Sequence, residues 1–149
     1  MERVTKAETL FKEGYNCSQA VVGAFSDLLP FDEDTILKLA SPFGGGMGRL
    51  REVCGAVSGM FIVLGFLEGY DNSSEAEKKK ELYEKVQLLA KKFENNNGSI
   101  VCRELLGLSV KNDSPAPEKR TEEYYKKRPC VELVKEAVKI LQEYLENTK

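Results

Sequence analysis

The sequence predicts an all-α, single-domain helical bundle around a central apolar helix at about residues 53–67. Three observations support this fold class. Apolar residues recur at helical spacing along most of the chain, one fifteen-residue stretch carries no charge, and no segment alternates as a half-buried strand would. The chain has 149 residues, 42% of them hydrophobic and 31% charged. A chain of this length and composition can bury a substantial core as one domain over 1–149.

Three helices are expected before the apolar stretch. The first ends at Gly14, and Asn16 is suited to cap the second, which stops before Pro30. Residues 32–40 start with acidic side chains, which stabilise a helix N-terminus. The inward faces of these helices are expected to carry Val4, Ala7, Leu10, Phe11, Ala20, Val21, Ala24, Phe25, Leu28, Ile36, Leu37 and Ala40.

The central helix is expected to be the most buried one. Its sequence, VCGAVSGMFIVLGFL, has no charged residue, and charged residues stand on both sides of it. A bilayer span needs roughly 20 apolar residues, so a stretch of this length predicts a helix in a protein core and no membrane span.

A long amphipathic helix should follow the central one. Ser74 and Glu77 have the spacing of a capping box at its start, and the sequence NNNG at 95–98 should end it. Its inward face is expected to carry Leu82, Val86, Leu89 and Phe93.

The C-terminal third should hold two more helices separated by a polar connection. Ser99 is expected to cap a short helix, and the last helix should run from 129 or 130 to about 146. Residues 107–129 are polar, contain two prolines in the middle and show no periodicity. A loop of this length in a compact domain is usually functional or mobile.

Charge and composition exclude several function classes. The net charge is −2, which provides no concentrated basic surface for nucleic acid. The first residues, MERVTKAETLFKEG, lack the pattern of a secretory signal, so we expect a cytoplasmic protein whose thiols meet a reducing environment. Histidine is absent, which excludes Cys–His catalysis, histidine triads and histidine metal ligands.

The four cysteines are the strongest functional signal. None belongs to a C-x-x-C pair, so neither a thioredoxin-type motif nor a zinc ribbon is present. Each is nevertheless expected in the first turn of a helix, where the helix dipole and free N–H groups favour a thiolate. This shared position predicts one redox or metal site made of Cys17, Cys54, Cys102 and Cys130.

A glycine-rich run, FGGGMGR at 43–49, comes shortly before the second of these cysteines. It matches neither the phosphate-binding loop nor the dinucleotide fingerprint. Backbone without side chains can point N–H groups at an anion such as a thiolate, a cluster sulfide or a ligand, or it can simply make a tight turn. Both interpretations stay open. The candidate cofactor-binding residues are Gly44, Gly45, Gly46, Gly48 and Arg49.

The sequence resembles the C_GCAxxG_C_C family, described as redox-active proteins. The resemblance rests on CGAVSG at 54–59, although the family label writes the first two letters in the opposite order. It also rests on one cysteine before the motif, in GYNCSQAV, and two after it, in VCRELLG and RPCVELV. It implies a helical prokaryotic protein that is redox-active through its cysteines and has no established substrate.

Three functions remain open at this point. In the first, a thiol–disulfide or electron-transfer protein, Cys54 would attack and Cys17 or Cys130 would resolve the mixed disulfide, with another redox protein or a small molecule as partner. Cys54 is expected to be the most reactive thiol because a helix start, the glycine run and two arginines adjoin it. In the second, the four thiolates hold zinc or an iron–sulfur cluster. The third is a structural or interaction protein, such as a homodimer, with buried thiols.

Overall fold

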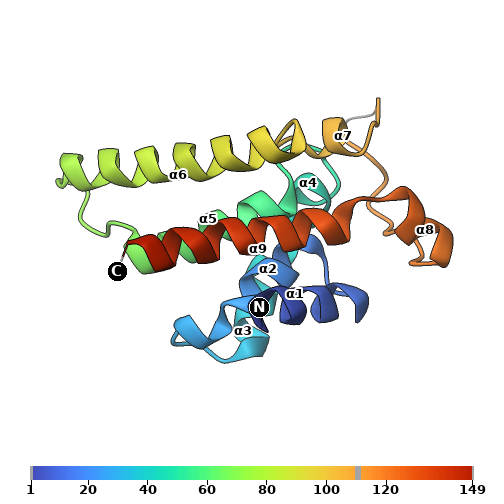
Figure 1. Cartoon of the computed structure of the whole chain (residues 1–149), viewed down its shortest axis with the longest axis horizontal. Coiled ribbons are helices and arrows are strands. Elements are labelled where there is room, and N and C mark those ends of the chain that lie inside the picture. Colours follow the sequence, from blue (N-terminus) through green and yellow to red (C-terminus); the bar gives the residue numbers. More distant parts are fainter. Residues whose placement is uncertain (1, 110–111, 149) are drawn as a thin grey trace.

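Apolar helix faces pack around two central helices in the computed structural model, which describes residues 2–109 and 112–148 (Figure 1). The fold is an all-α single domain, and the described residues contain no strand. The α-helices are α1 (Glu2–Lys12), α2 (Cys17–Ala24), α3 (Glu33–Ala40), α4 (Gly44–Met47), α5 (Gly55–Glu68), α6 (Ala76–Asn97), α7 (Cys102–Leu105), α8 (Glu122–Lys127) and α9 (Cys130–Asn147). Short 3-10 turns, η1 (Ser26–Leu28) and η2 (Ser41–Phe43), flank α3.

Helices α2 and α5 form the centre of the core. Helix α2 packs against α1, α3, α5 and α9, and α5 packs against α2, α6 and α9. Residues 55–60 of α5 are all buried, whereas Phe66 near its C-terminal end is 45% exposed. A central apolar helix is therefore confirmed. Helix α2 has a larger buried share, six of its eight residues, so the expectation that α5 is the most buried helix is wrong.

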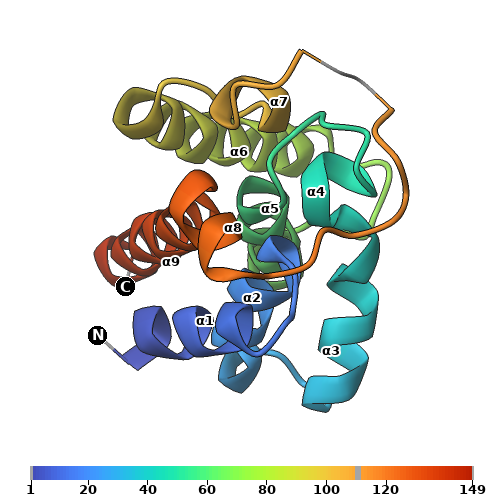
Figure 2. The same ribbon diagram turned by 90° about the vertical axis from the view of Figure 1, so that its right-hand side faces the viewer.

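The N-terminal ends of several helices meet at one end of the molecule. Helices α5 and α9 both start at the end where α7 and α8 lie, and α6 runs the opposite way alongside α9 (Figure 1). Turned by 90°, the same end shows the segment before α8 crossing in front of α2 and α4 (Figure 2). The fold therefore gathers helix N-termini on one face.

The expected helix starts and ends are mostly observed. Gly14 follows α1, Asn16 caps α2, and Gly98 ends α6 in the left-handed conformation. Helix α2 is shorter than expected, because the chain tightens into η1 after Phe25, and Leu28 is consequently 38% exposed. The inward face of α6 is observed, with Leu89 and Phe93 buried.

Two expected caps are not formed. The residue before α6 is Glu75, which makes no side-chain cap, and Ser74 donates to Asn72 instead of forming a capping box with Glu77. Before α7, the Ser99 hydroxyl accepts a hydrogen bond from the N–H of Val101 at 2.9 Å, so the helix starts two residues later than a Ser99 cap implies. In both cases the serine bonds its own turn, a known competitor of capping.

The polar connection at 107–129 is not a continuous loop. It contains α8, capped by the Thr121 hydroxyl, which accepts a hydrogen bond from the N–H of Tyr124. Six residues are too few for hydrophobic periodicity to indicate a helix. Residues 110 and 111 of this connection lie outside the described residues. Its expected mobility stays a prediction.

Among the helices within residues 2–109 and 112–148, none combines the length and apolarity that crossing a membrane requires. Helix α5, the most apolar candidate, spans 14 residues.

Candidate functional site

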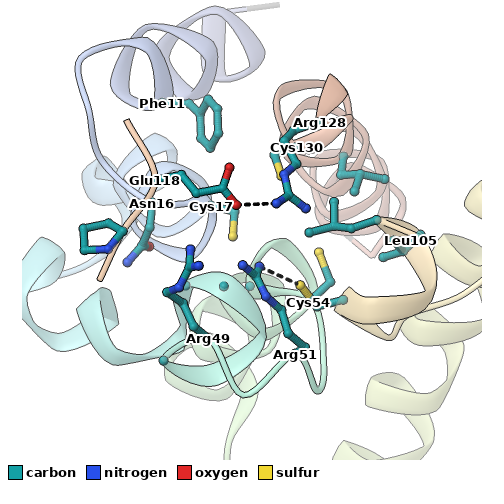
Figure 3. Close-up of a pocket in the computed structure, with 18 of the residues that line it drawn as sticks. Phe11, Asn16, Cys17, Arg49, Arg51, Cys54, Leu105, Glu118, Arg128 and Cys130 are labelled. Atoms are coloured by element: carbon teal, nitrogen blue, oxygen red, sulfur yellow. Dashed lines mark hydrogen bonds and ion pairs between the residues drawn. The ribbon is translucent and has the colours of Figure 1, made fainter. Parts of the chain in front are cut away.

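A cavity of about 350 Å³ lies where the helix N-termini meet (Figure 3). The structure brings all four cysteines to its wall. Cys17, Cys102 and Cys130 are the first residues of α2, α7 and α9, and Cys54 is the residue immediately before α5. The cysteines therefore come from four separate helix starts that the fold collects around one space.

Cys17 is held by a complete capping box. The Asn16 side-chain oxygen accepts from the N–H of Gln19 at 2.9 Å, and the Gln19 side-chain oxygen accepts from the N–H of Asn16 at 3.0 Å. The Asn16 amide also donates to the carbonyl of Ser41 at 2.9 Å, which ties the start of α2 to the turn before the glycine run. The backbone at Cys17 is thus fixed on both sides.

The sulfur of Cys17 lies against Gly55, the glycine of the CGAVSG motif. A Cβ placed on Gly55 would approach Cys17 Sγ to 2.5 Å and the carbonyl oxygen of Phe43 to 2.9 Å. Real Cβ atoms do not make contacts this short, so only glycine lets the sulfur occupy this position. The glycine therefore brings Cys17 next to the residue that follows Cys54.

Cys54 and Cys102 flank a single antiparallel bridge between Val53 and Val101. The N–H of Cys54 donates to the carbonyl of Ile100 at 2.7 Å, and the N–H of Cys102 donates to the carbonyl of Glu52 at 2.6 Å. Both cysteines come one residue after the paired valines, so they occupy diagonal positions on one face of the bridge. Diagonal neighbours in antiparallel pairs are roughly 7–8 Å apart.

Four of the five candidate residues of the glycine run line the cavity: Gly44, Gly45, Gly48 and Arg49. The fifth, Gly46, does not. It packs against Cys102, because a Cβ there would meet Cys102 Cβ at 2.6 Å and the backbone of Arg51 at 2.8 Å. Its φ of +69° also suits glycine. At Gly46 the run provides close packing around a cysteine.

Arginine side chains supply positive charge at the same wall. Arg51 is buried, and its Nη1 lies 3.6 Å from Cys102 Sγ. Arg51 Nη2 and Arg49 Nη2 donate to the same oxygen of Asp113, at 2.9 and 3.2 Å. Arg128 pairs with Glu118, and both side chains line the cavity (Figure 3).

Burial dominates the ionisation of three of the thiols. It raises the pKa of Cys54 well above its ordinary value, that of Cys130 to about 12, and that of Cys102 against the opposing effect of the Arg51 guanidinium. The charge of an ionised Cys17 is a further cause of the raised pKa of each of the three thiols. Cys17 is thus the common electrostatic neighbour of the other cysteines.

The expectation of a low pKa at Cys54 is consequently wrong. The residue is only 5% exposed, and the nearby backbone N–H groups of Ala56 and Val57 oppose the effect of burial on its pKa without overcoming it. The helix start does reach a cavity, but the sulfur is on the buried side of it. Desolvation therefore outweighs the helix N-terminus at this position.

A metal centre would need several ligands in mutual reach. Within residues 2–109 and 112–148, no three or more cysteine or acidic side chains are grouped closely enough to hold a metal ion.

The sequence alone did not indicate Arg120, Arg128 and Glu118 as site residues, although all three line the cavity. They come from the segment at 107–129 that lacks periodicity. Arg128 could have been suspected as a site residue, because it lies two residues before Cys130. Nothing in the spacing of the sequence indicates that Arg120 contacts the residues just before α2.

The match to known proteins covers most of the chain. The sequence model of one family, described as "Putative redox-active protein (C_GCAxxG_C_C)", matches residues 15–144. The matched region includes all four cysteines and the whole cavity wall except Phe11. No curated protein and no solved structure matches the chain. The chain therefore belongs to the C_GCAxxG_C_C family of proteins described as redox-active.

Proposed function

We propose that the protein carries out thiol–disulfide exchange, with Cys17 as the attacking thiol and Cys54 as the resolving thiol. The observation that carries this proposal is the contact of Cys17 Sγ with Gly55, the residue adjoining Cys54. This assignment reverses the roles that the sequence alone favours.

Accessibility supports Cys17 as the nucleophile. It is partly exposed and lines the cavity, whereas Cys54 and Cys102 are buried. A thiol must reach its substrate as well as ionise, and burial raises the pKa of the three other thiols. Cys130 is also partly exposed and lines the cavity at the start of α9, but burial raises its pKa to about 12. We therefore assign the attack to Cys17, at the start of α2.

Position supports Cys54 as the resolving thiol. Its attack on the mixed disulfide is intramolecular, so proximity compensates for a raised pKa. Of the charged groups around Cys54, Cys17 has the largest effect on its pKa. The alternative pair Cys54–Cys102 is less suited, since diagonal positions roughly 7–8 Å apart exceed the usual Cα separation of about 7 Å or less in a disulfide.

The exchange takes place in two steps. The Cys17 thiolate attacks one sulfur of a disulfide R–S–S–R, a Cys17–S–S–R bond forms, and R–S⁻ leaves. Cys54 then loses its proton, its sulfur attacks Cys17 Sγ, and the second R–S⁻ leaves. The two leaving thiolates take up the two protons that Cys17 and Cys54 released. Two protein thiols are oxidised, and one disulfide is reduced to two thiols.

Single serine variants test the two roles. Reduced protein is mixed with 2-hydroxyethyl disulfide, quenched with acid and analysed by mass spectrometry of the intact chain and of its peptides. We expect Cys54→Ser to stop at a mixed disulfide on Cys17, and Cys17→Ser to form none. Cys102→Ser and Cys130→Ser serve as controls and should still form the 17–54 disulfide. A mixed disulfide that accumulates in Cys102→Ser or Cys130→Ser instead would overturn the assignment of Cys54.

The same preparation separates exchange from the four-thiolate alternative. Protein purified without oxygen should be colourless and contain no stoichiometric zinc by elemental analysis. A broad brown absorbance would indicate an iron–sulfur cluster, and one zinc per chain a zinc site. Either result would contradict exchange as the main function of these cysteines.

A further inference from the structure

The cavity beside Cys17 carries more positive charge than its own acidic groups neutralise. Among the residues that the structure describes, four arginines line it, Arg49, Arg51, Arg120 and Arg128, and Glu118 is the one carboxylate in the lining. The chain as a whole is acidic, with a net charge of −2. The positive charge is therefore concentrated at this cavity and is not a general property of the protein.

Two of these arginines have clear roles within the protein. Arg128 pairs with Glu118, and Arg51 contacts Cys102 and Asp113. Each of these two arginines therefore has a carboxylate partner. The other two arginines need a separate explanation.

Arg120 has only neutral partners among the residues that the structure describes. Its guanidinium donates to the carbonyl oxygens of Phe11 and Tyr15, and lies 4.1 Å from the centre of the Phe11 ring and 5.8 Å from that of Tyr124. These contacts hold the guanidinium beside Tyr15, two residues before Cys17. None of them is with a carboxylate that would neutralise its charge. Three of the five guanidinium N–H donors are not used by these two carbonyls.

Arg49 shares its acidic partner, Asp113, with Arg51. One oxygen of Asp113 accepts hydrogen bonds from Arg49 Nη2 and from Arg51 Nε and Nη2, so a single negative charge serves two cations. The side chains of Arg49 and Arg51 point toward Cys17 (Figure 3). Within the described part of the chain, Arg49 forms no hydrogen bond with a sulfur, whereas Arg51 does.

We propose that the cavity binds a small disulfide that carries carboxylates, with Arg49 and Arg120 receiving the carboxylates and one sulfur placed against Cys17. This inference rests on the proposed exchange at Cys17 and names its substrate class. A volume of about 350 Å³ is at the lower end of small-molecule sites, and apolar side chains such as Phe11 and Leu133 complete the wall. Guanidinium groups are the side chains best suited to carboxylates.

The test compares three disulfides of similar length that differ in charge: 3,3′-dithiodipropionate with two carboxylates, neutral 2-hydroxyethyl disulfide, and cystamine with two ammonium groups. For each, the rate of mixed-disulfide formation at Cys17 is divided by its rate with free 2-mercaptoethanol. This ratio removes differences in intrinsic reactivity. We expect the dianion to exceed the neutral disulfide by roughly tenfold, the size of one charge-assisted hydrogen bond, and cystamine to be slowest.

Variants show which residues cause the preference for the dianionic disulfide. In Arg49→Gln/Arg120→Gln the rate of the dianion relative to that of the neutral disulfide should fall to about twofold or less, because removing both cations removes most of the charge-assisted binding. Arg3→Gln is the matched control, since it removes one cation that pairs with Asp27 and does not line this cavity. It should keep the full advantage of the dianion.

A measurement on the unaltered protein keeps the proposal testable if the double variant does not fold. Suberate has the length and charge of dithiodipropionate without its sulfurs, and 1,8-octanediol is its neutral counterpart. Suberate should slow the alkylation of Cys17 by iodoacetamide, and octanediol should not.

The outcomes distinguish the substrate class from the exchange itself. Equal normalised rates for all three disulfides, or no protection by suberate, would overturn the anionic substrate while leaving exchange intact. Absence of any mixed disulfide at Cys17 with all three would overturn both.

Discussion

Gly55 determines how closely α2 and α5 approach each other at the cavity. Cys17 Sγ occupies the space that a side chain at this position would need. Gly65, in the same helix, has no atom within 4 Å of an added Cβ. The two glycines therefore differ in role. Gly55 leaves the space that Cys17 Sγ occupies, whereas a side chain at Gly65 would meet no other atom.

This difference predicts opposite effects for the same substitution. Gly55→Ala should lower the free energy of unfolding by about 1–3 kcal/mol through overpacking, and slow formation of the 17–54 disulfide. Gly65→Ala should raise the free energy of unfolding by about 0.5–1 kcal/mol, because alanine is the better helix former. Urea unfolding of the reduced proteins measures both. Equal effects at the two positions would argue against the close contact of Cys17 with Gly55.

At the scale of elements, the capping of α2 and the segment before α8 define the two sides of the cavity. Asn16 fixes the start of α2. The segment at 112–121, which crosses in front of α2 and α4 (Figure 2), is fastened by Arg49 and Arg51 through Asp113, and by Arg120 through the carbonyls of Phe11 and Tyr15.

Removing the cap tests the first of these elements. Asn16→Ala should cost about 1 kcal/mol of stability, the usual effect of losing an N-cap. Asp32→Ala, which removes the cap of α3, is the matched control and should cost a similar amount. Only Asn16→Ala should change the rate at which Cys17 is alkylated, because only α2 positions that sulfur. Identical alkylation rates in the two variants would contradict the positioning role of Asn16.

Removing the shared carboxylate tests the second element. The hydrogen bond from Arg51 lowers the pKa of Asp113. The stabilisation from this interaction is therefore present at neutral pH and is lost only as pH falls through the lowered pKa. Asp113→Asn should therefore speed amide hydrogen exchange of residues 112–121 at pH 7. Glu123→Gln, which removes an exposed pair with Lys127, should leave this exchange unchanged. Equal protection in both variants would show that Asp113 does not fasten the segment.

At the scale of the whole molecule, the fold collects thiols at helix starts and buries most of them. Folding holds the thiols of Cys54 and Cys130 protonated at pH values where the unfolded chain ionises them. The pKa of a cysteine thiol in the unfolded chain is about 8.5. Because the folded pKa of these thiols is higher, the free energy of unfolding keeps its full value below that pH and falls as pH rises above it.

The reduced protein should accordingly lose stability between pH 7.5 and 9.5. Urea unfolding in the presence of a phosphine reductant measures the loss, and this range stays below the ionisation of unfolded tyrosine near 10. The loss should be smaller in Cys54→Ala/Cys130→Ala, measured against its own value at pH 7.5. A loss of the same size in that variant would contradict the account of buried, protonated thiols.

Local patterns predicted most of the helices, because an apolar face at helical spacing reports burial directly. The capping of α2 by Asn16 and the end of α6 at Gly98 follow from such local signals. The caps at Ser74 and Ser99 fail because each serine has a closer partner in its own turn. Helix α8 is too short to show a period.

The candidate site was predictable in its cysteines and in most of the glycine run. Their common position at helix starts is a local property, whereas the burial of Cys54 depends on the bridge between Val53 and Val101, which joins distant segments. The approach of Arg120 to Phe11 likewise joins positions 109 residues apart. No spacing in the sequence encodes such contacts, so the sequence alone favours Cys54 as the nucleophile, whereas its burial led us to propose Cys17.

The order in which the cysteines are alkylated shows directly whether Cys17 is the attacking thiol. Reduced, metal-free protein is treated with limiting iodoacetamide at pH 7 to 9, and labelled peptides are quantified by mass spectrometry, with urea-unfolded protein as the reference for equal access. We predict that Cys17 is labelled first in folded protein at every pH, and that Cys54 is labelled last. Labelling of Cys54, Cys102 or Cys130 ahead of Cys17 would contradict the claim that Cys17 is the attacking thiol.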